Sequence, residues 1–356
     1  MSLRKTGFLP CLVVVALLAA CSPGLDRGDT VEAIVDDVLV PGFAAAAAAT
    51  AGLAGASASL CAAPGQSALE TARRAWSEAV VAWNATEVAW EGPVKMDRIE
   101  SLVHYPAVDV EEIEALLDGQ AEGEQLDAAD LASIVRGLGT AEYLLFASDD
   151  PAAVTAPGRC ELLMAVTDGA AAGAGAAELA WTDGWNGGAP YADTLAGRAE
   201  PAMDANDALA ELVAGIDAIL SNVTVQGLGL ALGRTREEPL PEALHEGAAG
   251  AAGDVLAARL AGIAAVYDPP GETPGLGDLV AERSDEVDAK VRADLAAAQE
   301  ALDSLGSPLT PALAASPDQA AALYDALVEL RRTFEADVAS LLDITVGFSD
   351  TDGDSG

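Results

Sequence analysis

The chain has 356 residues, which is enough for one large domain or two domains of moderate size. Its 57 Asp and Glu residues outnumber 18 Lys and Arg residues, and the formal net charge is −39. This balance excludes a typical nucleic-acid binder, which needs a basic face against phosphate. Hydrophobic residues make up 51% of the chain and aromatic residues only 4%, and the abundant alanine favours closely packed helices. The acidic surface either attracts cations or simply keeps the protein solvated.

Residues 1–21 have the order of a bacterial secretory signal. A basic start precedes an apolar run, residues 12–20, that is short for a bilayer-spanning helix. The sequence Leu18-Ala19-Ala20-Cys21 resembles a lipobox, which implies that residues 1–20 are removed and that Cys21 carries the lipid. An ordinary cleaved signal with a chance cysteine is the alternative. The serine after Cys21 favours the outer membrane over the inner one, with the protein facing the periplasm.

The first half of the mature chain, residues 29–200, follows a linker at 21–28 and shows helical patterns. Asp29 is expected to cap a helix over 30–62, with a kink at Pro41. Further helices are expected over 67–90, 110–117, 128–147 and 158–185, with polar connections at 94–109 and 187–200.

The second half, residues 201–348, continues the helical pattern up to an acidic, glycine-rich tail at 349–356. Helices are expected over 205–232, 253–267, 276–305 and 317–342. Proline and glycine mark the joints between them, at 237–241, 269–271 and 306–311. The whole pattern predicts an all-α protein made of two packed helical bundles, 29–200 and 201–348.

Two cysteines, Cys61 and Cys160, remain outside the signal and the lipid site. An exported protein folds in an oxidising compartment, so a disulfide between them is the simplest expectation. Two buried free thiols are the alternative. No CxxC spacing typical of a zinc site occurs.

The expected helix 128–147 places one carboxylate among apolar side chains. At about 100° per residue, leucine and phenylalanine side chains flank Glu142 on both sides. A carboxylate there must find a partner or take up a proton. Glu142 is therefore either a ligand-binding group or the partner of an arginine such as Arg98 or Arg73. Gly139, one turn earlier, either leaves room for a ligand or lets another element approach.

The chain has only two histidines, His104 and His245. His104 lies in the polar connection 94–109, which would face Glu142, and it is a candidate metal ligand. A hydrogen-bonded loop histidine is the alternative. The same connection carries further candidate ligand-binding residues, namely Asp97, Arg98 and Tyr105. His245 is expected on the surface at the start of a helix, and Glu87 is another candidate metal ligand. Oxygen-rich sites suit hard cations, ferric iron and calcium among them.

Four segments of the chain carry a distinctive pattern: 73–76 leading to 90–93, the tract 96–106, Arg136-Gly-Leu-Gly-Thr-Ala-Glu-Tyr-Leu-Leu-Phe146, and the ending 346–354. In this order they resemble the imelysin family of bacterial envelope proteins. The segment 136–146 is the most specific of them. The resemblance covers nearly the whole mature chain and implies two helical bundles, a pocket near their contact, and a link to iron uptake or iron-regulated expression.

The imelysin family also has a Gly-x-His-x-x-Glu motif. Because of this motif, the family has been classed with metallopeptidases. Gly137 and Glu142 match this motif, but Gly139 stands at the histidine position. The missing histidine weakens the expectation of metal binding at this position. It also weakens the expectation of zinc-dependent hydrolysis, since a catalytic zinc usually has three protein ligands and a water.

The resemblance and the position of Glu142 together predict a lipid-anchored envelope protein that binds iron or a small iron complex without catalysis. Its ligand site would include Gly137, Gly139 and Glu142. Two alternatives stay open: a metallopeptidase of the imelysin type, and a metal-independent scaffold for another envelope protein. No P-loop, Gly-x-Ser-x-Gly elbow or His-Glu-x-x-His motif points to a different enzyme class.

Overall fold

The computed structural model describes residues 24–105, 108–119, 126–200 and 202–345, and every regular element in these ranges is helical. The all-α prediction is confirmed. The expected signal segment, the lipid site Cys21 and the acidic tail lie outside the described residues.

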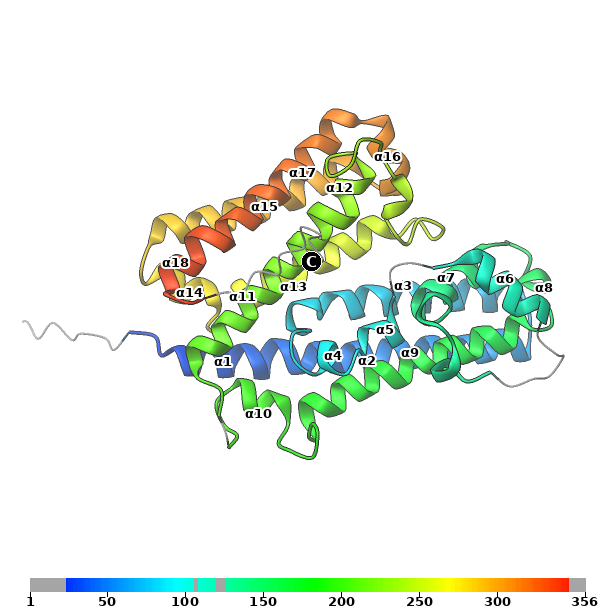
Figure 1. Ribbon diagram of the computed structural model, residues 1–356, viewed down its shortest axis with the longest axis horizontal. Helices are drawn as coiled ribbons and strands as arrows, with labels where there is room; N and C mark the ends of the chain where they lie inside the picture. The colour runs from blue at the N-terminus through cyan, green and yellow to red at the C-terminus, as the bar shows by residue number, and fades with distance from the viewer. Residues whose placement is uncertain (1–23, 106–107, 120–125, 201, 346–356) are drawn as a thin grey trace, which may run out of the picture.

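The first half forms an elongated bundle, which runs horizontally in Figure 1. Its long axis is a continuous rod of α1 (Arg27–Ile34), the π-helical turn η1 (Val35–Leu39) and α2 (Val40–Ala62). Two more long helices pack on α2, namely α3 (Gln66–Ala85) and α9 (Arg159–Thr182). The remaining elements are short: η2 (Glu87–Ala89), α4 (Pro93–Met96), α5 (Glu100–Val103), α6 (Val110–Gly119), η3 (Ala128–Asp130), η4 (Ser133–Val135), α7 (Gly137–Phe146), α8 (Pro151–Val154) and α10 (Tyr191–Leu195).

The second half forms another bundle that lies obliquely across the first (Figure 1). One rod consists of α11 (Ala205–Ser221), the π-helical turn η5 (Asn222–Gly227) and α12 (Leu228–Ala231). Helix α17 (Pro317–Arg332) packs on this rod and runs on through η7 (Thr333–Val338) into α18 (Ala339–Leu342). Helix α15 (Asp285–Leu305) packs on α17, and α13 (Ala252–Tyr267) packs on α15. Three short elements complete the bundle: η6 (Pro241–Ala243), α14 (Leu276–Ala281) and α16 (Leu309–Ala315).

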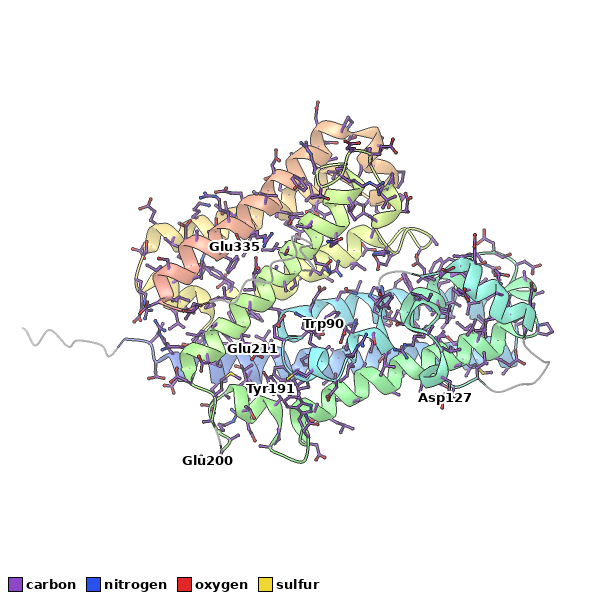
Figure 2. The ribbon with its side chains drawn as sticks, viewed as in Figure 1. Trp90, Asp127, Tyr191, Glu200, Glu211 and Glu335 are labelled. Carbon is purple, nitrogen blue, oxygen red and sulfur yellow. A yellow bond between two sulfur atoms is a disulfide. The ribbon has the colours of Figure 1, made fainter. Side chains whose placement is uncertain are left out.

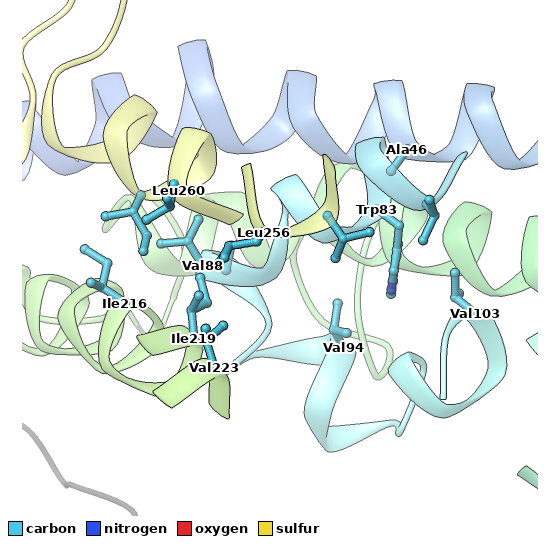
Figure 3. Packing of buried hydrophobic residues seen from close by; sticks show 14 of the residues in the cluster. Ala46, Trp83, Val88, Val94, Val103, Ile216, Ile219, Val223, Leu256 and Leu260 are labelled. Atoms are coloured by element: carbon cyan, nitrogen blue, oxygen red, sulfur yellow. The ribbon is translucent and has the colours of Figure 1, made fainter. Parts of the chain in front are cut away.

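The two halves meet along one tightly packed contact, where α13 lies on α3 and α11 lies on η2. A Cβ atom at Gly262 of α13 would lie only 2.4 Å from the backbone oxygen of Ala85, and one at Gly215 of α11 would lie 2.0 Å from that of Val88. Glycine is therefore required at both positions. Buried side chains from both halves form one continuous core across the contact (Figure 3).

Polar groups and long apolar helices also take part in this contact. The Tyr191 hydroxyl of α10 donates to Glu211 Oε1 of α11 at 2.6 Å. Both residues are labelled in Figure 2. The helical stretches 27–62 and 205–231 are long and apolar enough to cross a membrane. Buried core helices can have the same length and composition. In this fold both stretches pack against neighbouring helices.

The structure corrects the start and the bend of the first helix. Asp26, not Asp29, caps it, because its side chain accepts hydrogen bonds from the backbone N–H groups of Gly28 and Asp29. In place of the kink expected at Pro41, a π-helical turn covers residues 35–39 and ends two residues before the proline. Proline has no N–H to donate to the previous turn, and a π-bulge absorbs that missing hydrogen bond.

The expected helix 128–147 is wrong over its first half, where two short 3₁₀ turns replace it. Arg136 is extended, and Gly137 has a φ of 73°, in the left-handed region that favours glycine. A Cβ at Gly137 would lie 2.5 Å from the Val103 backbone oxygen. Helix α7 therefore begins only at Gly137.

Three other expectations differ in detail. The predicted helix 276–305 is two helices, because Ser284 caps α15 by accepting from the Val287 N–H. The predicted loop 187–200 contains α10, and the predicted turn 306–311 contains the start of α16.

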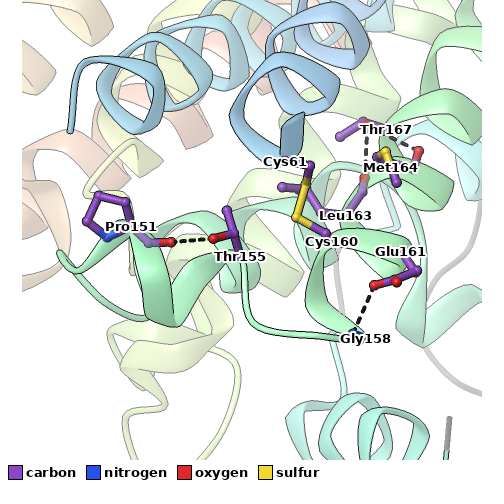
Figure 4. The surroundings of a disulfide bond; sticks show 9 residues. All are labelled: Cys61, Pro151, Thr155, Gly158, Cys160, Glu161, Leu163, Met164 and Thr167. Atoms are coloured by element: carbon purple, nitrogen blue, oxygen red, sulfur yellow. Dashed lines mark hydrogen bonds between the residues drawn. A yellow bond between two sulfur atoms is a disulfide. The ribbon is translucent and has the colours of Figure 1, made fainter. Parts of the chain in front are cut away.

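The predicted disulfide is confirmed: Cys61 at the end of α2 is bonded to Cys160 in the first turn of α9, with 5.7 Å between the Cα atoms (Figure 4). The bond closes a loop with a sequence separation of 99 residues. It ties together the far ends of two helices that already pack along their length.

Candidate functional site

Buried ionisable side chains gather where the first half faces the connection between η6 and α13. Glu142 of α7, His104 after α5 and Glu246 of that connection are each 7% exposed. His104 Nε2 lies 3.0 Å from Glu246 Oε1. Ala249 donates its backbone N–H to Glu142 Oε1 at 2.8 Å. These two contacts join segments that are far apart in the sequence.

The His104 ring is oriented by Asn84, which is fully buried in α3. Asn84 Nδ2 donates to the Val80 backbone oxygen at 2.8 Å and lies 3.3 Å from His104 Nδ1. Since an amide nitrogen only donates, Nδ1 accepts and the proton of a neutral His104 ring sits on Nε2. His104 therefore donates to Glu246.

The pKa values of the two carboxylates in the cluster are shifted from their ordinary values in opposite directions. Burial raises the pKa of Glu142 to about 7; the Ala249 N–H opposes this shift, and the charge of Glu246 adds to it. Burial also acts to raise the pKa of Glu246, but the hydrogen bond from His104 and the positive charge of Arg259 outweigh it and lower the pKa overall. Glu246 is thus the ionised partner, and Glu142 exchanges its proton near neutral pH.

A second ion pair borders this cluster on the side of α13. Arg259 Nε donates to Glu87 Oε2 at 2.6 Å, and Glu87 is 9% exposed. Arg259 also contributes positive charge toward Glu246 and His245. Glu87, expected as a metal ligand, is therefore held by an arginine across the contact between the halves.

The expectation for His245 is wrong. The residue is half-buried in the connection before α13 and does not start a helix, and burial lowers its pKa. The neighbouring Glu246 was not singled out from the sequence. The signal was available, because His245-Glu246 places one of only two histidines beside a carboxylate in an apolar, glycine-rich stretch.

Arginine does not neutralise Glu142 in the way considered from the sequence. Arg73 donates to the backbone oxygens of Leu145 and Ser148 and pairs with Asp149. Arg98 is exposed and, with Asp97, lines a different pocket. The groups that act on Glu142 are instead backbone N–H groups, Glu246 and His104.

Gly139 serves close packing. A Cβ there would lie 2.4 Å from Val108 Cγ2 and 3.4 Å from the Tyr105 backbone oxygen. Tyr105 and Val108 therefore fill the space in which a histidine at this position would begin. Tyr105, expected as a ligand residue, contributes its backbone to this packing.

The cluster offers two carboxylates and one imidazole, donors that suit hard and borderline cations. Within the described ranges, no group of three or more His, Cys, Asp or Glu side chains is arranged to hold a metal ion. His104 and Glu246 are paired with each other, and Glu142 accepts a hydrogen bond from the Ala249 N–H. As it stands, the site can take up one proton or exchange that proton for a cationic group.

Comparisons with known proteins agree with this fold. The family model for imelysin (Peptidase_M75) matches residues 39–334. A protein described as an iron-regulated protein A precursor from Parabacteroides distasonis ATCC 8503 has a similar crystal structure, with a TM-score of 0.74 and 17% identity over 90% of this chain and 97% of that one. An imelysin-like protein from Psychrobacter arcticum 273-4 is similar at a TM-score of 0.72 and 20% identity, over 92% of this chain and all of that one. No curated protein matches the sequence.

Proposed function

The chain belongs to the imelysin family, and on this premise we propose that it is an exported, lipid-anchored envelope protein that binds a small iron complex without catalysing a reaction. The signal-like residues 1–20 and Cys21 support export and anchoring. The iron-regulated name of a structural relative supports the link to iron.

One observation carries the binding proposal: Glu142 is buried beside the His104–Glu246 pair, and burial raises its pKa to about 7. A buried carboxylate that is costly to ionise is stabilised when a cation replaces its proton. Carboxylate oxygens and imidazole are suitable ligands for iron.

The number of donors favours a complex over a bare ion. The family histidine is absent, and Val108 fills the space beside Gly139. Glu142, Glu246 and His104 together offer fewer ligands than an iron ion prefers. An iron chelate that brings its own oxygen donors needs only one or two groups from the protein, and Glu142 is the group we expect to bind it.

Calorimetric titration of residues 22–356 with ferric citrate tests the proposal. Glu142→Gln should weaken binding about tenfold or more, since a hydrogen bond or ligand bond to a charged group is worth about 1.5–3 kcal/mol. Glu78→Gln, which changes an exposed carboxylate of α3, is the matched control and should bind like the parent.

Three results would contradict the proposal. The first is no binding at millimolar ferric citrate, and the second is equal loss in both variants. The third is chelator-sensitive cleavage of a peptide library, which would support the metallopeptidase alternative.

Metal-independent capture of one envelope protein, without iron binding, would support the scaffold alternative. Anchoring is tested separately, because Cys21→Ser should move the protein out of the membrane fraction.

A further inference from the structure

We propose that a pocket built around Arg98 and Arg136, apart from the Glu142 cluster, binds the carboxylate of a small organic acid. The pocket has a volume of about 430 Å³ and is lined by residues of the α4–α5 segment and by residues that precede α7. Glu142, His104 and Glu246 are not among its lining residues. The inference therefore does not depend on iron binding.

The charge of the pocket contrasts with that of the protein. Only 18 of 356 residues are lysine or arginine, against 57 acidic residues, and two of these cations line this one pocket. The planar guanidinium group matches a carboxylate with two parallel hydrogen bonds.

Arg136 is held in place but not neutralised. Its Nε donates to the Ser101 backbone oxygen at 3.0 Å, its Nη2 to Ser101 Oγ at 3.2 Å and its Nη1 to the Leu131 backbone oxygen at 3.3 Å. A guanidinium has five N–H groups, so two remain for a ligand. Carbonyl and hydroxyl oxygens leave its full positive charge, and none of the ion pairs between described residues includes Arg136.

Arg98 is placed in a backbone conformation that does not suit it. Its φ is 56°, in the left-handed region where glycine is favoured. The side chain is exposed and makes no hydrogen bond or ion pair with any residue in the described ranges. Burial raises the pKa of the nearby Glu100, and the positive charge of Arg98 opposes this shift only in part. Arg98 lines the pocket together with Arg136.

Asp97 limits the ligand to a single negative charge. It lines the same pocket, and its Oδ2 accepts from Trp185 Nε1 at 2.7 Å. With two arginines and one aspartate, the lining carries a net charge of about +1, which favours a monocarboxylate over a polyanion. The hydroxyl group of Ser133 in the lining can bond to a hydroxyl of the ligand, whereas the Ser101 hydroxyl already donates to the Arg98 backbone oxygen at 2.8 Å.

The probe for this site is L-lactate, titrated calorimetrically into residues 22–356 at low ionic strength, with citrate and inorganic phosphate as comparison ligands. Arg98→Gln and Arg98→Gly should each weaken lactate binding about tenfold or more. Arg98→Gly should also leave the thermal midpoint unchanged or raise it, because glycine tolerates the positive φ. Arg74→Gln, at an exposed arginine of α3, is the charge-matched control and should bind like the parent.

Each of four outcomes would overturn the proposal. They are no binding of lactate at millimolar concentration, tighter binding of phosphate or citrate than of lactate, equal weakening by Arg74→Gln, and a lower thermal midpoint in Arg98→Gly with unchanged affinity. The last outcome would show that Arg98 has a structural role only. A weakened but folded Arg98→Gly variant would support the site.

Discussion

Replacing Glu142 with glutamine removes a charge that the fold tolerates only at a cost. Burial raises the pKa of Glu142 from 4.5 to about 7. Each pKa unit corresponds to about 1.4 kcal/mol, so ionised Glu142 destabilises the folded protein by about 3 kcal/mol. Glutamine keeps the oxygen that accepts the Ala249 N–H and carries no charge. Glu142→Gln should therefore be the more stable protein at alkaline pH.

The pH dependence has a definite sign. Because the pKa of Glu142 is higher in the folded state, the folded protein retains a proton that the unfolded chain releases between pH 4.5 and about 7. The stability of the parent should fall through this window as the pH rises, and then level off. The difference between Glu142→Gln and the parent should be near zero below pH 4.5 and about 3 kcal/mol above pH 7.

Urea denaturation followed by circular dichroism, at several pH values from 4 to 8.5, measures this difference. Glu78→Gln reports any general effect of removing one negative charge from an acidic protein. A stability difference that is constant with pH would refute the reasoning, and so would a parent that is more stable than Glu142→Gln above pH 7. A constant difference would mean that attractive partners balance burial at Glu142, and a more stable parent would mean that they outweigh it.

Three further predictions concern packing and pairing. Gly139→His should lower stability by about 1–3 kcal/mol, because its side chain would meet Val108, and adding Val108→Ala should recover part of the loss in the same denaturation assay. Replacing both disulfide-bonded cysteines with serine should cost about 4–5 kcal/mol in the chain-entropy model, and an unchanged urea midpoint would contradict it. Arg259→Met should cost about 3–5 kcal/mol, because it leaves a buried carboxylate unpaired. Arg332→Met, at an exposed pair, should leave the midpoint nearly unchanged, and equal losses would contradict this distinction.

The sequence alone was sufficient for properties that depend on local pattern. Helical periodicity and alanine content predict the all-α class, because an α-helix satisfies its backbone hydrogen bonds within one segment. Two remaining cysteines predict the Cys61–Cys160 bond. The apolar neighbours of Glu142 predict that it is buried, and the structure agrees.

Only the tertiary structure decided which groups face Glu142 and where its helix begins. Gly137 has a left-handed backbone, and the Val103 carbonyl, from another segment, lies where a Cβ would be, so only glycine fits there. Glu246 meets His104 because α13 packs on α3 closely enough to require Gly262. Such pairings come from the packing of segments that are distant along the chain, and periodicity within one helix contains no information about them.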